Sequence, residues 1–334
     1  MSKKYHVYGI GNALVDIEYQ VDEKFLKKYK VEKGVMTLVD EQTQSRLMDA
    51  IDHHQANFKP GGSAANTIFA VSQFGGKAFY SCKVANDPLG DAYLKDMKEA
   101  GIDTNFGRQQ QEDGITGKCL VMITDDAERT MNSFLGITST LSTQEVDEIA
   151  IRESEYAYIE GYLVTSESGR EAMKQTKKVA QNNDVKIVLT LSDPSIVEGF
   201  RDHFDNIIGA SVDLLFCNER EARIYTGKDD LMEARETLKK DARRFVITQG
   251  KNGAMIYDGD TFIDIEPYDV KAIDTNGAGD MYAGAFLYGI THGLGYAGAG
   301  KLASLAGSRV VSQYGPRLKW HEVQEILHHL SQDD

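Results

Sequence analysis

Residues 274–280 read DTNGAGD, and a run of small and apolar residues follows them directly. This change of pattern predicts a loop that opens into a buried helix. Gly277 and Gly279 leave space over the backbone, and the free N–H groups of a helix N-terminus favour an anion. Asp280 falls in or near the first turn of that helix. A carboxylate beside an anion site suits an enzyme in which the carboxylate takes a proton while the N–H groups hold the charge of a group in transfer.

The same segment has a second interpretation. Asp is common in the first turn of a helix because its charge complements the helix dipole. Glycines before a helix often mark only a tight turn. Residues 274–280 alone leave both interpretations open, so evidence from the other polar loops of the chain is needed to distinguish them.

A second glycine-rich loop, at residues 58–66, also runs into a helical segment, at residues 67–74. Gly61 and Gly62 allow a ligand to approach the backbone closely. Ser63 and Asn66 supply donors and acceptors that suit a polyhydroxylated ligand. The alternative is a serine N-cap with ordinary turn glycines, which the local sequence favours.

The first predicted strand, at residues 6–11, ends in glycines that only partly resemble a dinucleotide-binding fingerprint. Leu14 occupies the place of the third glycine, and residues 15–21 alternate like a strand where the fingerprint requires a helix. We therefore reject a dinucleotide site. Asn12 and Asp16 remain as polar groups at a strand end, able either to bind hydroxyl groups or to form an Asx turn.

From about residue 150 the chain alternates regularly between predicted strands and helices. This alternation indicates an α/β fold in which a parallel sheet is covered on both faces. Ligands bind such sheets at the carboxyl ends of the strands. Asn12, the loop at 61–66, Asn218, Gly250 and the loop at 274–280 all fall at strand ends, so we expect them to converge on one crevice.

Two hairpin-like segments, at about residues 13–39 and 116–134, do not fit that alternation. We assign them to a small β-sheet lid over the crevice of a single domain that spans residues 1–334. A lid would exclude water, which competes with the intended acceptor when a phosphoryl group is transferred.

The composition argues against several classes of function. The 334 residues include 37 Lys and Arg against 51 Asp and Glu, and the formal net charge of −14 argues against general binding of nucleic acids or anionic membranes. The three cysteines are widely spaced and show no disulfide or zinc pattern. Because no signal segment or membrane-spanning run is found, we expect a cytoplasmic protein.

Four motifs together resemble the PfkB (ribokinase-like) family of carbohydrate and nucleoside kinases over essentially the whole chain. They are the segment at residues 274–286, the glycine loop at 61–66, the Asn-x-x-Glu pattern at 218–221 and the strand and turn at 247–253. The resemblance implies a three-layer α/β/α fold with a central, mostly parallel sheet and a small β-sheet lid. It also implies ATP and Mg²⁺ as cofactors. The chain has no Walker A motif, so its phosphates must be held in another way, which two glycine loops at helix N-termini supply.

Within the family the chain is most similar to adenosine kinases, in the segments at residues 11–17, 21–29, 191–192 and 274–277. This resemblance implies transfer of a phosphoryl group from ATP to the 5′-hydroxyl of adenosine, which gives AMP and ADP. Asp280 would be the general base that accepts the hydroxyl proton. Gly277, Ala278 and Gly279 would form the anion hole.

The resemblance also implies roles for residues that bind the two substrates. Those that would hold the acceptor are Asn12, Asp16, Gly62, Ser63, Asn66, Met122, Met131, Ser133 and Tyr162, together with Arg129, which would approach phosphate. Those that would serve ATP are Asn218, Thr248, Gly250 and Asn276, and Glu221 would organise Mg²⁺ beside them.

Other functions stay open at this stage. The acceptor could be another nucleoside or a free sugar such as ribose or fructose, because the positions that contact the base are less distinctive than the phosphate site. A nucleotide or sugar sensor without catalysis is the alternative from another class, and the presence of Asp280 and both anion-hole glycines argues against it. We expect small-molecule substrates only, with no nucleic-acid or membrane partner, and either a monomer or a homodimer.

Overall fold

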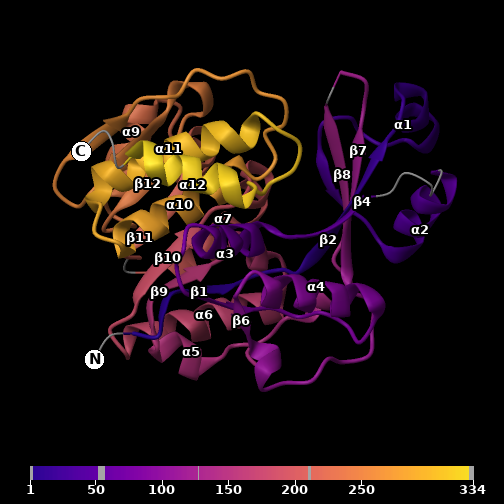
Figure 1. Cartoon of the computed structure of the whole chain (residues 1–334), viewed down its shortest axis with the longest axis horizontal. Coiled ribbons are helices and arrows are strands. Elements are labelled where there is room, and N and C mark those ends of the chain that lie inside the picture. Colours follow the sequence, from indigo (N-terminus) through magenta and orange to yellow (C-terminus); the bar gives the residue numbers. More distant parts are fainter. Residues whose placement is uncertain (1–2, 52–56, 127, 210–211, 331–334) are drawn as a thin grey trace.

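In the computed structural model, the described part of the chain comprises residues 3–51, 57–126, 128–209 and 212–330. It forms a large sheet surrounded by helices and a small sheet to one side (Figure 1). The strands of the large sheet are β1 (Tyr5–Ile10), β5 (Ala78–Ser81), β6 (Asp103–Thr104), β9 (Ser154–Ile159), β10 (Lys186–Thr190), β11 (Leu214–Asn218), β12 (Phe245–Thr248), β13 (Ala254–Tyr257) and β14 (Phe262–Ile265). Their order is β14-β13-β12-β11-β10-β9-β1-β5-β6.

The strands from β12 to β6 run parallel to their neighbours, whereas β13 and β14 are antiparallel. Helices connect the parallel strands. The helices of the described residues are α1 (Glu23–Tyr29), α2 (Glu41–Ala50), α3 (Ser63–Gln73), α4 (Pro88–Glu99), α5 (Glu148–Arg152), α6 (Glu167–Gln181), α7 (Pro194–Ile208), α8 (Glu219–Thr226), α9 (Leu231–Leu238), α10 (Ala278–Thr291), α11 (Gly295–Val311) and α12 (Trp320–Leu330). Short 3₁₀ helices are η2 (Asn105–Gly107), η3 (Gly136–Thr140), η4 (Gly161–Thr165) and η5 (Gly250–Asn252).

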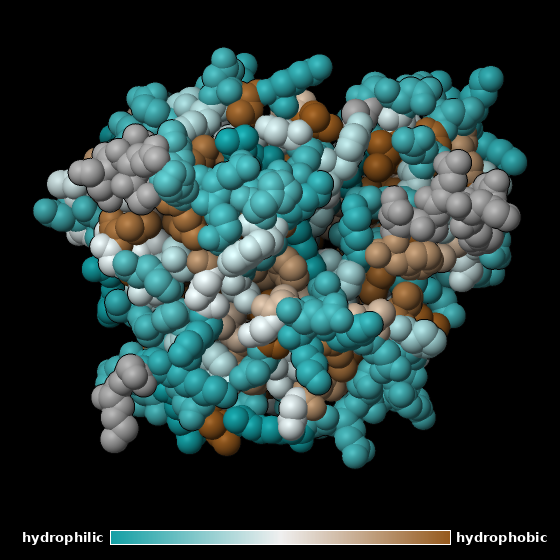
Figure 2. Space-filling view, viewed as in Figure 1, coloured by the Kyte–Doolittle hydropathy of each residue, from teal (hydrophilic) through white to brown (hydrophobic). Residues whose placement is uncertain are grey.

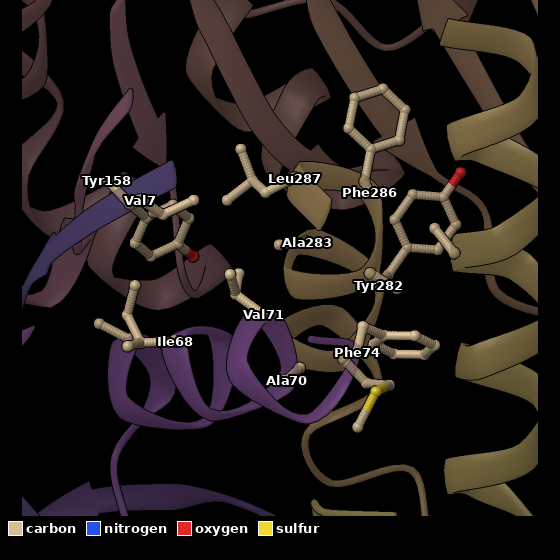
Figure 3. Close-up of a cluster of buried hydrophobic side chains, with 14 of the residues drawn as sticks. Val7, Ile68, Ala70, Val71, Phe74, Tyr158, Tyr282, Ala283, Phe286 and Leu287 are labelled. Carbon is tan, nitrogen blue, oxygen red and sulfur yellow. The ribbon is translucent and has the colours of Figure 1, made fainter. Parts of the chain in front are cut away.

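Helices cover both faces of the large sheet. Successive side chains of β1 point to opposite faces, so Val7 joins the core on one side while Tyr8 and Ile10 join the core on the other. The first core includes residues of α3, α10 and α11, and Figure 3 shows Val71 of α3 beside Ala283 of α10 in this layer. The second core includes residues of α6, α7 and α8. The predicted three-layer α/β/α fold is therefore confirmed.

The small sheet has five strands in the order β3-β8-β7-β2-β4. Their bounds are β2 (Leu14–Gln20), β3 (Met36–Leu38), β4 (Asn57–Gly61), β7 (Gly117–Ile123) and β8 (Arg129–Phe134). Four of these strands lie in the two segments that the sequence pattern assigned to the lid. The fifth, β4, falls in a segment that was predicted as a glycine-rich loop, and it contains Pro60, a residue that disfavours a strand interior. Proline is tolerated here because β4 is an edge strand.

One face of the small sheet is packed against α1 and α2. Both helices begin at an aspartate cap, because Asp22 and Asp40 accept hydrogen bonds from the backbone N–H groups of Phe25 and Thr43. Leu47 of α2 joins a core with residues of β2 and β7. The opposite side of the small sheet is turned toward the large sheet.

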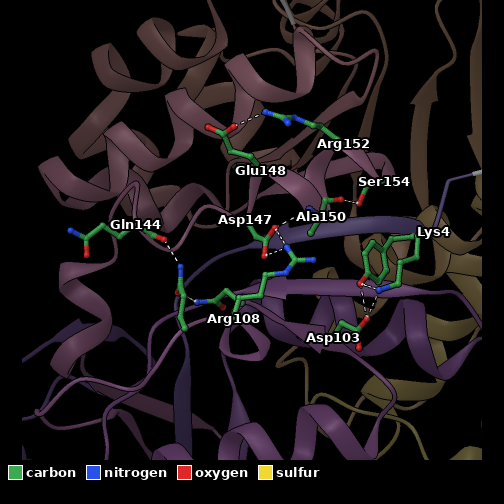
Figure 4. A network of polar contacts seen from close by, with 12 residues as sticks. Lys4, Asp103, Arg108, Gln144, Asp147, Glu148, Ala150, Arg152 and Ser154 are labelled. Carbon is green, nitrogen blue, oxygen red and sulfur yellow. Dashed lines mark hydrogen bonds and ion pairs between the residues drawn. The ribbon is translucent and has the colours of Figure 1, made fainter.

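Ion pairs lie near β6, the edge strand of the large sheet, and near the start of β1 (Figure 4). Arg108 Nη1 lies 2.6 Å from Asp147 Oδ1, and the same carboxylate accepts a hydrogen bond from the N–H group of Ala150 at the start of α5. Lys4 pairs with Asp103 at 3.1 Å, where both side chains are more than half exposed. Exposed pairs of this kind contribute little to stability, so they orient the loops while the two apolar cores supply most of the folding energy.

The face shown in Figure 2 is mostly hydrophilic, with hydrophobic residues in small groups. Scattered apolar side chains are ordinary on globular proteins. Among the helices of the described residues, none is both long and apolar enough to cross a membrane.

The crossing of α3 and α10 gives a first prediction. A Cβ atom on Gly284 would lie 2.5 Å from both the Ala70 Cβ and the Thr67 carbonyl oxygen of α3. We expect Gly284→Ala to lower the free energy of unfolding by about 1–3 kcal/mol, because the helices would have to move apart. Urea denaturation measures the change. The matched control is Gly199→Ala in α7, where a Cβ meets nothing within 4 Å and no loss is expected; equal stability of Gly284→Ala and wild type would contradict the close crossing.

Candidate active site

The carboxyl ends of the central strands open into a crevice of about 800 Å³, which the small sheet borders on the other side. Polar loops from both halves of the chain meet there, as the strand-end argument predicts. The predicted site residues that line it are Asn12, Asp16, Gly62, Ser63, Asn66, Arg129, Met131, Ser133, Tyr162, Asn218, Glu221, Thr248, Asn276, Gly277, Ala278, Gly279 and Asp280.

Two predicted site residues lie outside this lining. Met122 belongs to the core beneath α1 and α2, so the prediction that it lines the acceptor pocket is wrong. The reason is the period of two in a strand, which turns Cys119 of β7 toward the crevice and Met122 away from it. Gly250 is exposed at the start of η5, and its contact with ATP stays a prediction.

The loop at residues 274–280 enters α10 at the base of the crevice. Gly277 adopts a left-handed conformation with φ of +74°, and a Cβ there would lie 2.3 Å from the Pro316 Cβ. Glycine is therefore required at this position for two reasons, conformation and space. A Cβ on Gly279 would meet nothing within 4 Å. The N-terminus of α10 thus has open space over it, and its first N–H groups have no intrahelical acceptors.

Asp280 lies in the first turn of α10 and is held by two side chains of α3. Ser63 Oγ donates a hydrogen bond to Asp280 Oδ1 at 2.6 Å, and Asn66 Nδ2 donates to Oδ2 at 3.4 Å. Burial raises the pKa of the Asp280 carboxyl to about 6, although both hydrogen bonds oppose the shift. A carboxylate with such a pKa is ionised at pH 7 and is suited to accept a proton.

The contact of Ser63 with Asp280 also decides between the two interpretations of the second glycine loop. Helix α3 is capped by Gly62, which has φ of +100°, and no side-chain hydrogen bond caps it. The serine N-cap that the local sequence favours is therefore wrong. The hydroxyl is directed across the crevice to the carboxylate of α10 instead.

Glu160, which sequence analysis did not select, joins the first strand end to the second glycine loop. It follows β9 and is 1% exposed. Its Oε2 atom accepts hydrogen bonds from the N–H groups of Asn12 at 2.9 Å and Ala64 at 3.4 Å. Burial raises the pKa of Glu160 to about 8. An acidic residue near the end of the strand predicted at residues 156–161 was the signal that could have revealed it.

Asp16 of β2 projects from the small sheet into the crevice. It is 9% exposed, and a Cβ on Gly61 would lie 2.5 Å from its Oδ2 atom, so glycine is needed in the neighbouring strand. Burial raises the pKa of Asp16 to about 7, and the positive charge of Arg317 opposes this shift. The Asp16 side chain lines the same crevice as Asn12 and Asp280.

Arg129 of β8 joins the small sheet to the loop before α10. Its Nη2 atom lies 2.6 Å from Asp274 Oδ2, and its Nη1 atom lies 3.4 Å from Glu18 Oε1. Asp274 in turn accepts hydrogen bonds from the N–H groups of Asn276 and Gly315. The guanidinium therefore stands close to the N-terminal loop of α10, with its charge balanced by two carboxylates.

One wall of the crevice is apolar. Its side chains come from the small sheet and from the residues next to it. They are Leu14, Met36, Leu38, Met131 and Leu135. Of these residues, only Met131 was predicted to line the crevice. Met36 and Leu38 belong to β3, which is too short for the sequence to show which of its side chains face the crevice. An apolar wall beside polar loops suits a ligand with one flat apolar part and one hydroxylated part.

At the far end of the crevice, Asn218 and Glu221 form a capping box at the start of α8. Asn218 Oδ1 accepts a hydrogen bond from the Glu221 N–H group at 2.9 Å, and Glu221 Oε2 accepts one from the Asn218 N–H group at 3.0 Å. Burial raises the pKa of Glu221 to about 7. Thr248 lies next to Asn218 in the neighbouring strand. Among the described residues no group of three or more His, Cys, Asp or Glu could hold a metal by itself.

The buried position of Glu160 makes the stability of the ligand-free protein depend on pH. Its pKa of about 8 in the folded state lies above the usual value of 4.5, so the folded state binds the proton more tightly. Stability is therefore lost as pH rises between these values. We expect Glu160→Gln, which resembles the protonated form, to gain stability relative to wild type by up to about 1.4 kcal/mol per pH unit in that window. Urea denaturation at pH 5 and pH 8 measures the difference; a difference that does not change with pH would contradict the shift.

Comparison with known proteins agrees with the fold. The family model of pfkB family carbohydrate kinases matches residues 34–322. Adenosine kinase 1 of Arabidopsis thaliana is 26% identical over 335 residues, which cover 92% of this chain and 94% of that protein. A 5-dehydro-2-deoxygluconokinase of Halalkalibacterium halodurans is 28% identical over 285 residues, or 82% of this chain and 86% of that protein.

A solved structure is similar over nearly the whole chain. The adenosine kinase from Sinorhizobium meliloti has a TM-score of 0.90 and 31% sequence identity, and the match covers 98% of this chain and 99% of that chain. The chain therefore belongs to the pfkB family of carbohydrate kinases and is an ATP-dependent phosphotransferase.

Proposed function

We propose that the protein transfers the terminal phosphoryl group of ATP to the 5′-hydroxyl of adenosine, giving AMP and ADP. The observation that carries this proposal is the position of Asp280 in the first turn of α10, where Ser63 and Asn66 hold its carboxylate. The similarity to adenosine kinases supports adenosine as the acceptor.

Asp280 accepts the proton of the acceptor hydroxyl as the oxygen attacks phosphorus. Its pKa of about 6 keeps it ionised at pH 7 yet close enough to that pH for efficient proton transfer. Ser63 and Asn66 fix both carboxylate oxygens, so the base is oriented before the substrate arrives.

The N-terminus of α10 holds the charge of the transferring group. In this proposal the N–H groups of Gly277, Ala278 and Gly279 bind that group, with open space beside Gly279, and the helix dipole adds to their field. The Ala278 N–H group also donates a hydrogen bond to the Thr275 carbonyl oxygen at 3.3 Å. Arg129 stands near enough to this loop to contribute a positive charge. Phosphoryl transfer depends mainly on such positioning and charge stabilisation.

The acceptor lies with its ribose against the polar loops and its base against the apolar wall. Asn12, Asp16 and Gly62 offer partners for ribose hydroxyls. Met131, Ser133 and Tyr162 contribute to the pocket for the base, together with Met36 and Leu38. The small sheet acts as a lid that keeps water from the reacting groups.

ATP extends from the α10 loop toward Asn218 and Thr248. Mg²⁺ would neutralise charge on the phosphates when it is bound. Glu221 and Asn218 fit such an ion, because Mg²⁺ in kinases is held by one or two protein groups, by phosphate oxygens and by water. Asn276 steadies the loop that faces the phosphates, since its N–H group is fixed by Asp274.

The role of Asp280 is tested by Asp280→Asn. We expect kcat to fall by about 10²–10⁴-fold, because a positioned general base contributes a factor of this size, while binding of the acceptor is kept. A coupled assay of ADP release measures turnover, and calorimetry measures binding. The matched control is Asp264→Asn on the exposed surface of β14, which should leave turnover unchanged. Turnover near the wild-type value in Asp280→Asn would show that Asp280 is not the base.

The acceptor is tested with a panel of nucleosides and free sugars. We expect the highest kcat/KM with adenosine, because the apolar wall gives a purine ring a surface to pack against. The similarity to a 5-dehydro-2-deoxygluconokinase makes a sugar acid or free sugar the main alternative. Activity on a free sugar but on no nucleoside would overturn the adenosine proposal. Binding by calorimetry without any ADP release would point to a sensor.

A further inference from the structure

Arg317 lies between α11 and α12 and contacts Asn66, a residue that lines the crevice. Its side chain is 15% exposed. The Nε atom donates a hydrogen bond to Asn66 Oδ1 at 3.1 Å, and Nη1 donates to Asp96 Oδ2 of α4 at 2.7 Å. The guanidinium also lies over the ring of Phe69, 3.9 Å from the ring centroid. Arg317 is thus fixed in three directions by groups from two helices.

The contact with Asn66 determines which end of that amide faces Asp280. An amide side chain has an oxygen that only accepts and a nitrogen that only donates. Because the oxygen accepts from Arg317, the Nδ2 group is turned toward the carboxylate of Asp280, 3.4 Å away. With the amide reversed, its oxygen would face the carboxylate and repel it.

Other residues could not easily replace Arg317 at this point. The planar guanidinium carries donors in fixed directions, so one side chain can bind an amide and a carboxylate while its face stacks on an aromatic ring. Lysine would keep the charge but offers no N–H group in the plane at the position of Nε. Asn66 is 5% exposed, so water has little access to take the place of the lost donor.

We propose that Arg317 is a positioning residue for the reaction, which orients the Asn66 amide and thereby keeps a hydrogen-bond donor on the Asp280 carboxylate. The proposal rests on the proposed role of Asp280 as the base. It extends the site to the segment after α11 and to Asp96 of α4, neither of which borders the crevice.

The effect of the charged groups around these residues on kcat has to be distinguished from the effect of the Arg317–Asn66 hydrogen bond. Asp96 faces Arg317, while the carboxyl groups of Asp16 and Glu160 lie close enough to Asp280 to feel its charge. Arg317 itself lowers the pKa of Asp16 through its positive charge. A variant that keeps the charge but loses the Nε–H donor is therefore needed beside one that loses both.

The experiment is a double-mutant cycle between Arg317 and Asn66. We expect Arg317→Met to lower kcat about tenfold, a factor typical for the loss of one oriented hydrogen bond, with little change in the KM for ATP. In the Asn66→Ala background the same substitution should change kcat by less than about twofold, because no amide is left to orient. Arg309→Met, an exposed arginine of α11, is the matched control and should leave kcat unchanged.

The Arg317→Lys variant separates orientation from charge and from folding. It keeps a positive charge near Asp16, so we expect a kcat as low as in Arg317→Met but a KM for the acceptor closer to wild type. The acidic limb of the pH–kcat profile should move to higher pH in both variants, because the Asn66 hydrogen bond lowers the pKa of Asp280. Thermal unfolding checks that each variant is folded.

Two outcomes would overturn the proposal. One is a wild-type kcat in Arg317→Lys, which would mean that only the charge matters. The other is an equal loss of kcat with and without the Asn66 amide. Failure of the proposed function gives a different result, since Asp280→Asn would then keep its turnover whatever the Arg317 variants do.

Discussion

The hydrogen bonds from Ser63 and Asn66 to the carboxylate of Asp280 join the two glycine loops of the chain at one point. The two loops are more than 200 residues apart in sequence, and each opens a helix. Their helices cross closely at Gly284, so the distance between donor and carboxylate is determined by helix packing. Every other feature of the crevice is arranged around this contact: the α10 N-terminus beside it, the small sheet across from it, and Arg317 behind Asn66.

A second constraint is that several carboxyl groups are buried in the crevice. Burial raises the pKa of Asp16, Glu160, Glu221 and Asp280 alike. Of these four carboxyl groups, Asp16 feels the positive charges of Arg317 and Arg129. Such an arrangement suits a site whose ligands bring hydroxyl groups to some carboxyls and a divalent cation to another, because burial of unpaired charge is otherwise costly. The acidic site and the anion-binding helix end thus serve different parts of the same reaction.

The sequence predicts the layered α/β fold and the convergence of the polar loops because both follow from local patterns. Alternating strands and helices require a parallel sheet, and parallel sheets place strand ends together. The errors concern contacts that local patterns do not contain. The resemblance to adenosine kinases placed Met122 in the acceptor pocket, although its side chain lies in the core beneath α1 and α2. The segment at residues 58–66 was predicted as a glycine-rich loop, although part of it forms the edge strand β4. Glu160 and Arg317 act through partners more than 90 residues away, so their contacts are seen only in the tertiary structure, although the place of Glu160 at a strand end was a signal in the sequence.

The most direct test of this account is a crystal structure with adenosine and a non-hydrolysable ATP analogue bound together. If Asp280 is the base, the 5′-oxygen of adenosine will lie within hydrogen-bonding distance of its carboxylate. The terminal phosphate will lie against the N–H groups of residues 277–279, with Ser63 and Asn66 still on the carboxylate. A phosphate bound away from the α10 N-terminus, or an acceptor hydroxyl directed away from Asp280, would contradict this account.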